Sequence, residues 1–348
     1  MPTIKDVARL AGVAVSTASM AINNHPRIAP ETRLKVLAAA RELNYQPNAM
    51  ARSLKRRRTE SIGLILTDIS GPFYSELIKG VEDVVLERGY QLLVSSAHAG
   101  REESVRRLLT EGRTDGLIVM APNLKDDDLA AVAGEEFPVV VLDRRLQGKG
   151  ISSIRVDNVS AAATAVTHLI ANGCRSIAYV SGPQLSRDNQ ERLQGYRQAL
   201  EQAGLPAPAS LLIPGDFTEE GGRRAAQWLM DRGPLPDGIF AANDEMAIGV
   251  MEALRERGVR IPEEVAVVGF DDIRMAAYVR PALTTVRQFK YELGQRAATI
   301  LFAMLDGTGE ERAEQISTEL VVRESCGQRL RSGAPPARAA GGAPSSNN

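Results

Sequence analysis

Apolar runs alternate with helical patterns along most of this 348-residue chain, and the whole alternation occurs twice. Residues 62–66 form a continuous run of the kind found in buried parallel strands, and a helical pattern over 74–88 follows it. Residues 176–180 repeat the first run, and a second helical pattern over 192–202 follows in the same way. Strands that alternate with helices favour doubly wound parallel sheets. We therefore predict two α/β lobes with a ligand cleft between them, at the carboxyl ends of the strands.

Further apolar runs predict the remaining strands of the two lobes. The composition changes only near the end of the chain. The C-terminal segment after Gly327 is rich in Gly, Ala, Pro and Ser, which predicts disorder. It contains no leucine heptad of the kind that would assemble a coiled coil. The remaining predicted elements are strands at 91–94, 116–120, 138–143, 238–241 and 265–270, and a helix at 103–109.

The first 23 residues have a different pattern, that of two short helices joined by a turn. Thr3 and Asp6 stand three residues apart, the spacing of a capping box, and Gly12 interrupts the apolar pattern. A third helix is expected from Pro30 to about Leu43, opened by a proline whose missing N–H costs nothing there. Three such helices close one small core, and the first two predict a helix-turn-helix whose second helix enters the DNA major groove.

The charge of the chain is divided unevenly, although the net charge is only −1. Residues 1–60 hold 11 Lys and Arg against 4 Asp and Glu, whereas the rest of the chain holds 31 against 39. Phosphate neutralisation requires cations only where DNA is contacted. A basic head on an acidic body is therefore typical of a DNA-binding domain joined to a sensing domain.

The segment between the head and the first strand has the composition of a hinge. Residues 48–54 are long enough for only about two helical turns, which are unstable alone in water. DNA or a partner chain would be needed to order them. Residues 55–58 are all basic and also suit a flexible linker.

Several classes of protein are disfavoured by what the sequence lacks. Cys174 and Cys326 are the only cysteines, which favours a reducing compartment over a disulfide scaffold. Neither a basic-then-apolar leader nor an apolar run of about 18 residues occurs, so we expect a cytoplasmic protein without a membrane partner. The G-x-x-x-x-G-K, G-x-S-x-G and zinc-spaced histidine motifs are missing too, so we expect no enzyme, no cofactor and no metal. Residues 126–128 are acidic, but we expect them to cap a helix.

Six short motifs together resemble the lac/galactose-repressor (LacI/GalR) family of bacterial transcription regulators. The resemblance extends from Thr3 to about Gly327. It implies an all-α helix-turn-helix head with a hinge helix, a two-lobed periplasmic-binding-protein-like α/β body, and a homodimer. The motifs are Thr3–Ala8, Asn44–Asn48, Ala51–Leu54, Ala242–Ala247, Val268–Asp272 and Arg280–Val286.

The same resemblance divides the chain into four parts. The head is expected at 1–46 and the hinge helix with its linker at 47–60. The effector-binding and dimerisation body is expected at 61–327 and the disordered tail at 328–348. The absence of a leucine heptad in that tail favours a dimer over a tetramer.

The resemblance also assigns the residues that contact DNA. Base reading falls on the recognition helix, where a Ser hydroxyl meets base edges and apolar side chains meet thymine methyl groups. Met20 stands where the family often has Arg or His, which leaves the bases opposite it open. Leu54 matches the hinge leucine that enters the minor groove and kinks the duplex. The base-reading positions are Val15, Ser16 and Met20, and the positions suited to phosphates or capping are Thr17, Ser19 and Asn23.

A small-molecule site between the lobes is implied as well. Its planar Arg, Asn, Asp and Gln groups suit adjacent hydroxyls, and its aromatic faces suit a sugar ring. Two alternatives remain open at this point: Asn243 and Asp271 could merely cap helices, and Arg192 could bind an acidic effector. The implied residues are Phe73, Tyr74 and Asp143 from the first lobe, and Arg192, Phe217, Asn243, Asp271 and Gln288 from the second.

These observations lead to one functional hypothesis and two alternatives. We expect a DNA-binding transcriptional regulator, a repressor, whose affinity for a near-palindromic operator is controlled by a sugar or sugar derivative bound between the lobes. The first alternative keeps the regulator but places it under the control of a phosphorylated carrier protein. The second is a soluble solute-binding protein, which the basic head disfavours.

Overall fold

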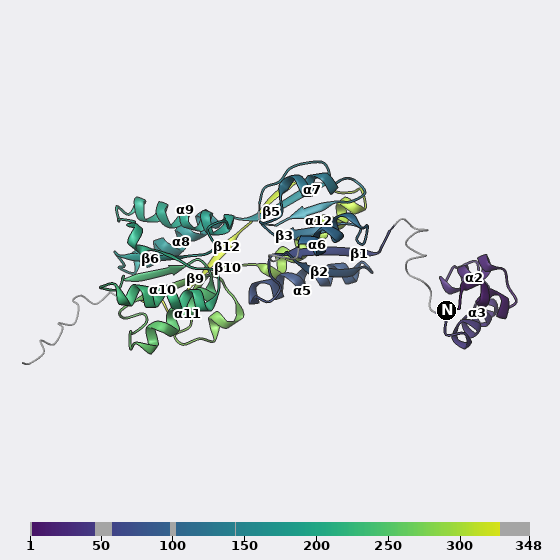
Figure 1. Cartoon of the computed structure of the whole chain (residues 1–348), viewed down its shortest axis with the longest axis horizontal. Helices are drawn as coiled ribbons and strands as arrows, with labels where there is room; N and C mark the ends of the chain where they lie inside the picture. The colour runs from purple at the N-terminus through teal and green to yellow at the C-terminus, as the bar shows by residue number, and fades with distance from the viewer. Residues whose placement is uncertain (1, 46–57, 98–101, 143, 328–348) are drawn as a thin grey trace, which may run out of the picture. The chain divides into compact units, whose positions relative to one another are not determined.

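The computed structural model describes residues 2–45, 58–97, 102–142 and 144–327. The chain divides into two compact units, Met1–Thr59 and Glu60–Asn348. Figure 1 draws both units with the labels used below. The predicted hinge helix with Leu54, the cleft residue Asp143 and the predicted disordered tail lie outside the described residues.

The first unit is a three-helix head of the predicted kind. Helices α1 (Ile4–Leu10), α2 (Val15–Ile22) and α3 (Pro30–Glu42) follow one another through short turns. The Thr3 backbone N–H donates to Asp6 Oδ2 over 2.9 Å, which supplies the acidic half of the predicted capping box. The Thr3 hydroxyl also donates to this carboxylate, over 2.7 Å. Small side chains let the helices approach closely, and the buried core consists of Val7, Ala8, Ala18, Ala21, Val36 and Ala39.

The second unit contains the two predicted α/β lobes, each built on a six-stranded sheet. The N-terminal lobe has the strand order β11-β5-β4-β3-β1-β2, and all its neighbouring strands are parallel. Its strands are β1 (Ser61–Leu66), β2 (Gln91–Ser96), β3 (Leu117–Met120), β4 (Val139–Val141), β5 (Ile151–Val156) and β11 (Ala313–Ile316). Its helices are α5 (Pro72–Glu87), α6 (Glu102–Thr110), α7 (Asp126–Val132) and α12 (Lys290–Leu305).

The C-terminal lobe repeats this topology with the order β12-β10-β9-β8-β6-β7. Only its last strand differs in direction, because β12 runs antiparallel to β10. Its strands are β6 (Ile177–Ser181), β7 (Leu212–Pro214), β8 (Gly238–Ala241), β9 (Ala266–Asp271), β10 (Thr284–Gln288) and β12 (Thr318–Val321). Its helices are α8 (Asn158–Ala171), α9 (Arg187–Gln202), α10 (Glu219–Asp231) and α11 (Asp244–Glu256), with short 3₁₀ turns at Ala209–Leu211 and Arg274–Ala277.

The chain passes between the lobes at three places: between β5 and α8, between β10 and α12, and between β11 and β12. Figure 1 shows these crossing segments where the two sheets approach each other. The edge strands β11 and β12, one in each sheet, both come from the C-terminal part of the chain. Sequence analysis did not predict β5, β7, β10, β11 or β12, because short edge strands and strands that follow long loops have weak periodic signals.

Two glycines bring α5 and α12 into direct backbone contact. A Cβ on Gly80 would lie 2.0 Å from the carbonyl oxygen of Tyr291, and one on Gly294 would lie 2.3 Å from that of Leu77. No larger residue fits at either position without moving a helix. The pair therefore behaves as one rigid element of the N-terminal lobe.

The second predicted helix of the repeat begins earlier than expected. Its first residue is Arg187 and not Arg192, because the Ser186 side chain accepts from the Asn189 backbone N–H and caps the helix there. The additional turn is polar, so apolar periodicity does not reveal it. It brings Arg187 and Asp188 toward the cleft. Within the described residues, no helix is both long and apolar enough to cross a membrane.

Candidate DNA interface and effector cleft

The recognition helix α2 divides its side chains between the head core and the surface. Ala18 and Ala21 are buried against the other helices, whereas Val15 is 43% exposed and Ser16 is exposed. An exposed aliphatic side chain beside an exposed hydroxyl suits the predicted base-reading positions. The exposed face of α2 therefore combines an apolar and a polar side chain, and neither belongs to the buried core of the head.

The other predicted DNA residues are less accessible. Thr17, Ser19 and Met20 are half-buried, and Asn23 is exposed at the C-terminal end of α2. The Asn23 side chain donates to the Ser19 carbonyl oxygen over 2.8 Å, which satisfies a carbonyl at the end of the helix. The capping interpretation of Asn23 is therefore confirmed, while its contact with phosphate stays a prediction.

In the second unit, the predicted site residues of the C-terminal lobe form one buried network. Arg192 and Asp271 are 4% and 5% exposed, with 3.6 Å between Nη1 and Oδ1. Arg192 Nε donates to Asn158 Oδ1 over 2.9 Å, Nη1 donates to the Ala242 carbonyl over 2.6 Å, and the guanidinium lies 3.8 Å from the Phe270 ring centroid. Gln288 Nε2 donates to Asp271 Oδ1 over 2.6 Å. Nη2 of Arg192 has no partner among the described residues.

Asn243 and Phe217 form a second, adjoining part of this wall. Asn243 Oδ1 accepts from the Met246 backbone N–H over 3.0 Å and caps α11, so the capping alternative holds for this residue. Its Nδ2 donates to the Phe217 carbonyl over 2.9 Å, and this bond steadies Phe217 in a left-handed conformation with φ of 67°. The Phe217 ring packs against Gly182, where a Cβ would lie 2.2 Å from the ring. Asp271, in contrast, caps no helix.

The N-terminal lobe contributes aromatic side chains. Phe73 and Tyr74, in the first turn of α5, are half-buried and meet edge to face with 5.3 Å between ring centroids. Burial raises the pKa of the Tyr74 hydroxyl to about 12, and the charges of Asp188 and Asp271 contribute to the rise. The Tyr74 hydroxyl therefore stays protonated at neutral pH.

The carboxyl end of β9 is held in an unusual backbone conformation. Asp271 and Asp272 both have positive φ, 116° and 52°, which non-glycine residues rarely adopt. Lys290, only 2% exposed at the start of α12, donates from Nζ to both of their carbonyl oxygens, over 2.7 and 2.9 Å. Its ammonium also lies 3.7 Å from Glu76 Oε1 on α5. Lys290 thus links the backbone at the carboxyl end of β9 in one lobe to the α5–α12 pair of the other.

Carboxyl groups are concentrated at this end of the C-terminal sheet. Burial raises the pKa of Asp271 to about 6, although Arg192 and Lys290 act in the opposite direction. Burial and the charge of Asp271 raise the pKa of the neighbouring Asp244 as well, and the pKa of Glu245 rises to about 7 for the same two reasons. The carboxyl groups at this end of the sheet therefore hold their protons to a higher pH than exposed carboxyl groups do.

Two residues of the cleft were missed by sequence analysis. Asn158 is 3% exposed and donates to Asp188 and Glu191 as well as accepting from Arg192. Lys290 stands in a helical segment where a lysine predicts a solvent-exposed position. Their hydrogen-bond partners lie 18 to 34 positions away along the chain, beyond the reach of helical or strand periodicity, so they leave no local signal. No cluster of potential metal ligands occurs among the described residues.

Comparison with known proteins agrees with both units. Residues 3–48 match the model of bacterial regulatory proteins of the lacI family, and residues 166–326 match a periplasmic binding protein-like domain. The HTH-type transcriptional repressor PurR of Pasteurella multocida is 36% identical over 334 residues, which cover 95% of this chain and 100% of PurR. The chain belongs to the lacI family.

Two solved structures of this family cover both units. The lac repressor dimer bound to operator and the anti-inducer ONPF has a TM-score of 0.81 at 30% identity, covering 93% of this chain and 99% of the other. The complex of the transcriptional regulator CelR with cellobiose has a TM-score of 0.69 at 36% identity, covering 93% and 100%. The predicted fold class is confirmed, and this lacI-family chain is a DNA-binding transcriptional repressor with a ligand-binding body, not an enzyme.

Proposed function

We propose that this lacI-family repressor acts as a homodimer on a near-palindromic operator, and that a carbohydrate bound between the lobes controls its operator affinity. The observation that carries the effector part is the buried Arg192–Asp271–Gln288 network. Its forked donors and acceptors suit the adjacent hydroxyls of a sugar. The complex of CelR with cellobiose supports this chemistry in a related protein.

The dimer and the DNA contacts have separate support. The related lac repressor was solved as a dimer on operator DNA, and the exposed Val15 and Ser16 on α2 provide a surface for base edges. A two-fold dimer places two recognition helices on successive major grooves. A regulator of this kind works where bacterial DNA lies, in the cytoplasm. We further propose a head at 1–46, a hinge with linker at 47–60, a body at 61–327 and a tail at 328–348.

Selection of binding sites from random duplexes tests the DNA part. The purified full-length protein should enrich a palindrome of about 14 to 20 base pairs. Val15→Ala should weaken binding to it, whereas Leu34→Ala, which shortens an aliphatic side chain 68% exposed on α3, should not. Leu54→Ala should weaken specific binding more than non-specific binding. Absence of an enriched motif would contradict the operator proposal.

Repetition of the selection with sugars and sugar acids tests the effector part. A true effector changes occupancy of the enriched operator, because it binds two conformations with different affinity. Arg192→Ala should abolish this response while operator binding without effector persists. A full response in that variant would remove Arg192 from the site.

A further inference from the structure

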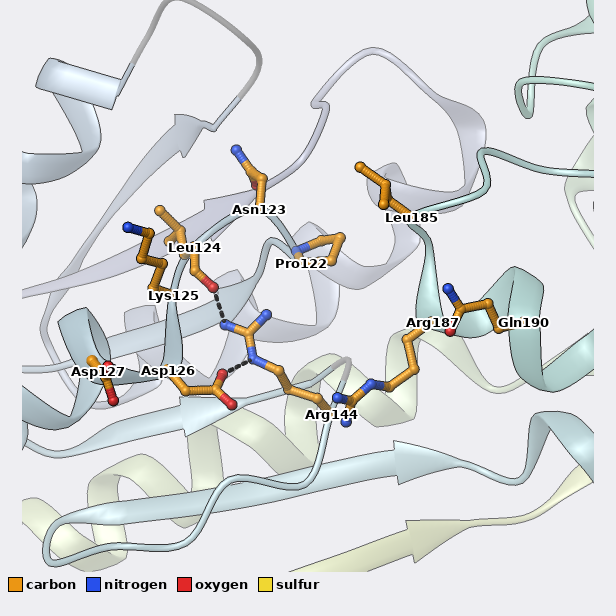
Figure 2. Close-up of a pocket in the computed structure, with 10 residues that line it drawn as sticks. All are labelled: Pro122, Asn123, Leu124, Lys125, Asp126, Asp127, Arg144, Leu185, Arg187 and Gln190. Carbon is orange, nitrogen blue, oxygen red and sulfur yellow. Dashed lines mark hydrogen bonds and ion pairs between the residues drawn. The ribbon is translucent and has the colours of Figure 1, made fainter.

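Helix α9 presents two different faces to its surroundings. One face borders a cavity of about 490 Å³ that both lobes line (Figure 2). The lining consists of residues 122–127, Arg144, Leu185, Arg187 and Gln190. The other face carries Asp188 and Arg192, which stand four residues apart and therefore lie one above the other on the helix. This second face is the one that meets the proposed effector residues, since Arg192 pairs with Asp271.

The spacing of Asp188 and Arg192 favours a direct ion pair. An acidic residue four positions before a basic one is the orientation that stabilises a helix best. The structure nevertheless pairs Arg192 with Asp271 of β9, and within the described residues no ion pair joins Arg192 to Asp188. Some other contact must therefore keep the guanidinium away from its neighbour on the helix.

The side chain of Asn158 lies between these two charged groups. Its Oδ1 accepts from Arg192 Nε over 2.9 Å, and its Nδ2 donates to Asp188 Oδ1 over 3.0 Å and to Glu191 Oε2 over 3.2 Å. Asn158 is only 3% exposed, so water has little access to these bonds. An amide offers an acceptor to a cation and a donor to a carboxylate at the same time. Asn158 therefore takes the place of a direct ion pair.

Asn158 is itself held by the segment that crosses between the lobes. It is the first residue of α8 and follows the last residue of β5 by two positions. The preceding residue, Asp157, caps α8 by accepting from the Ser160 backbone N–H over 3.0 Å, and its other carboxylate oxygen accepts from Gln315 Nε2 on β11 over 3.0 Å. The start of α8 is therefore bonded to both lobes.

Neutral oxygens, and not Asp271, make the shortest contacts with the Arg192 guanidinium. These are Asn158 Oδ1 at 2.9 Å from Nε and the Ala242 carbonyl oxygen at 2.6 Å from Nη1. The 3.6 Å between Nη1 and Asp271 Oδ1 is too long for a hydrogen bond. Loss of the Asn158 amide would free both Nε and the Asp188 carboxylate, which stand at the spacing of an ion pair.

We propose that Asn158 is a positioning residue of the effector site: it occupies the Asp188 carboxylate and thereby keeps Arg192 from an ion pair within α9. The guanidinium then stays beside Asp271 and Gln288, where the proposed effector binds. This inference rests on the proposed function, which makes Arg192 an effector-binding residue. Asn158 acts through Arg192 and needs no contact with the effector.

The proton affinity of Asp271 reports the position of Arg192 without any ligand or DNA. Burial raises the Asp271 pKa, whereas the charges of Arg192 and Lys290 lower it. The hydrogen bond from Gln288 lowers this pKa too, and the charge of Asp188 raises it. The measurement is a pH titration of the full-length protein containing carbon-13-labelled aspartate, followed by NMR. The Asp271 carboxyl signal is identified by its loss in Asp271→Asn.

A double-mutant cycle separates positioning from general damage. Asn158→Leu keeps the branched shape without polar atoms, and Arg192 should then move to Asp188. Asp271 would lose a cation and should bind its proton at least about 10-fold more tightly. In a chain that also carries Asp188→Asn, no charged carboxylate competes for Arg192, so Asn158→Leu should change the proton affinity by less than about 2-fold.

Asp157→Ala is the matched control from the same crossing segment. It removes the cap of α8 and the bond to Gln315 but touches neither Arg192 nor Asp188. The proton affinity of Asp271 should stay unchanged in this variant. If Asn158→Leu prevents folding, Asn158→Ala takes its place in the cycle with the same expectations.

Three outcomes would overturn the proposal. These are an unchanged proton affinity of Asp271 in the Asn158 variant, an equal rise with and without the Asp188 charge, and an equal rise in Asp157→Ala. The titration uses neither effector nor operator. Its failure is therefore distinguishable from failure of the proposed function, which the operator and sugar selections test.

Discussion

The two walls of the effector cleft are built in different ways. On the C-terminal wall, Arg192, Asp271 and Gln288 are almost fully buried and are bonded to one another before any ligand arrives. On the N-terminal wall, Phe73 and Tyr74 are half-buried and are arranged by ring packing. A bonded polar wall keeps its geometry without ligand, whereas an aromatic wall adapts to what it covers. The geometry of the C-terminal wall is therefore set by the folded protein itself.

The largest expected effect comes from breaking the bonded wall. Arg192→Met should lower the free energy of unfolding by about 3 kcal/mol or more, because Asp271 would remain buried without its cation. Urea unfolding at pH 8, where Asp271 is ionised, measures this loss. The loss should shrink at pH 5, where Asp271 is protonated. If Arg192→Met lowered the free energy of unfolding equally at both pH values, the packing of Arg192 and not its charge would stabilise this wall.

A smaller effect is expected at the link between the walls. Lys290→Met should lower the free energy of unfolding by about 2 kcal/mol, since the buried carbonyl oxygens of Asp271 and Asp272 would lose their donor. Lys79→Met provides the control, because Lys79 is an exposed lysine in a surface ion pair with Asp83. If both variants lowered the free energy of unfolding by the same amount, the two hydrogen bonds from Lys290 would stabilise the fold no more than a surface ion pair does.

The pH dependence of stability should reveal the acidic end of the sheet. The folded-state pKa values of Asp271 and Glu245, about 6 and about 7, lie above their unfolded values. The folded protein therefore binds more protons, and the free energy of unfolding falls as pH rises from about 4.5 to about 7. The contribution of Asp271 between pH 5 and 7.5 is about 1 kcal/mol.

Variants separate this trend from other titrations. Asp271→Asn and Glu245→Gln should each flatten the fall in stability, as followed by urea unfolding across the pH range. His168 opposes the fall, because burial lowers its pKa in the folded protein. If the free energy of unfolding fell with pH as steeply in both carboxyl variants as in the unsubstituted protein, the assigned pKa shifts would be wrong.

The smallest effect is expected on the aromatic wall. Tyr74→Phe should change the free energy of unfolding by less than about 1 kcal/mol, because it removes one hydroxyl bonded to Thr67 and keeps the ring against Phe73. Thermal unfolding provides the measurement. A loss as large as that of Arg192→Met would mean that the aromatic wall contributes as much to stability as the bonded wall.

Local sequence pattern was sufficient to predict the helical head, seven of the twelve strands that the structure describes, and the repetition of the two lobes. The spacing of Thr3, Asp6 and Gly12 predicted the head, and the apolar runs at 62–66 and 176–180 predicted the interior strands β1 and β6 of the two sheets. These signals are local, because periodicity and capping depend on neighbours within one or two turns. The resemblance to the family added Arg192, Asp271 and Gln288, which the structure brings together.

Tertiary structure alone decided which of these residues touch and which others join them. Asn158, Lys290 and Arg144 are ordinary polar residues in the sequence, yet each is buried and bonded to a distant segment of the chain. Arg187 of one lobe and Lys125 of the other line the same cavity only because the chain crosses between the lobes three times. A side chain's partners depend on where strands end and helices begin in space, and such contacts between residues far apart in sequence have no periodic signature.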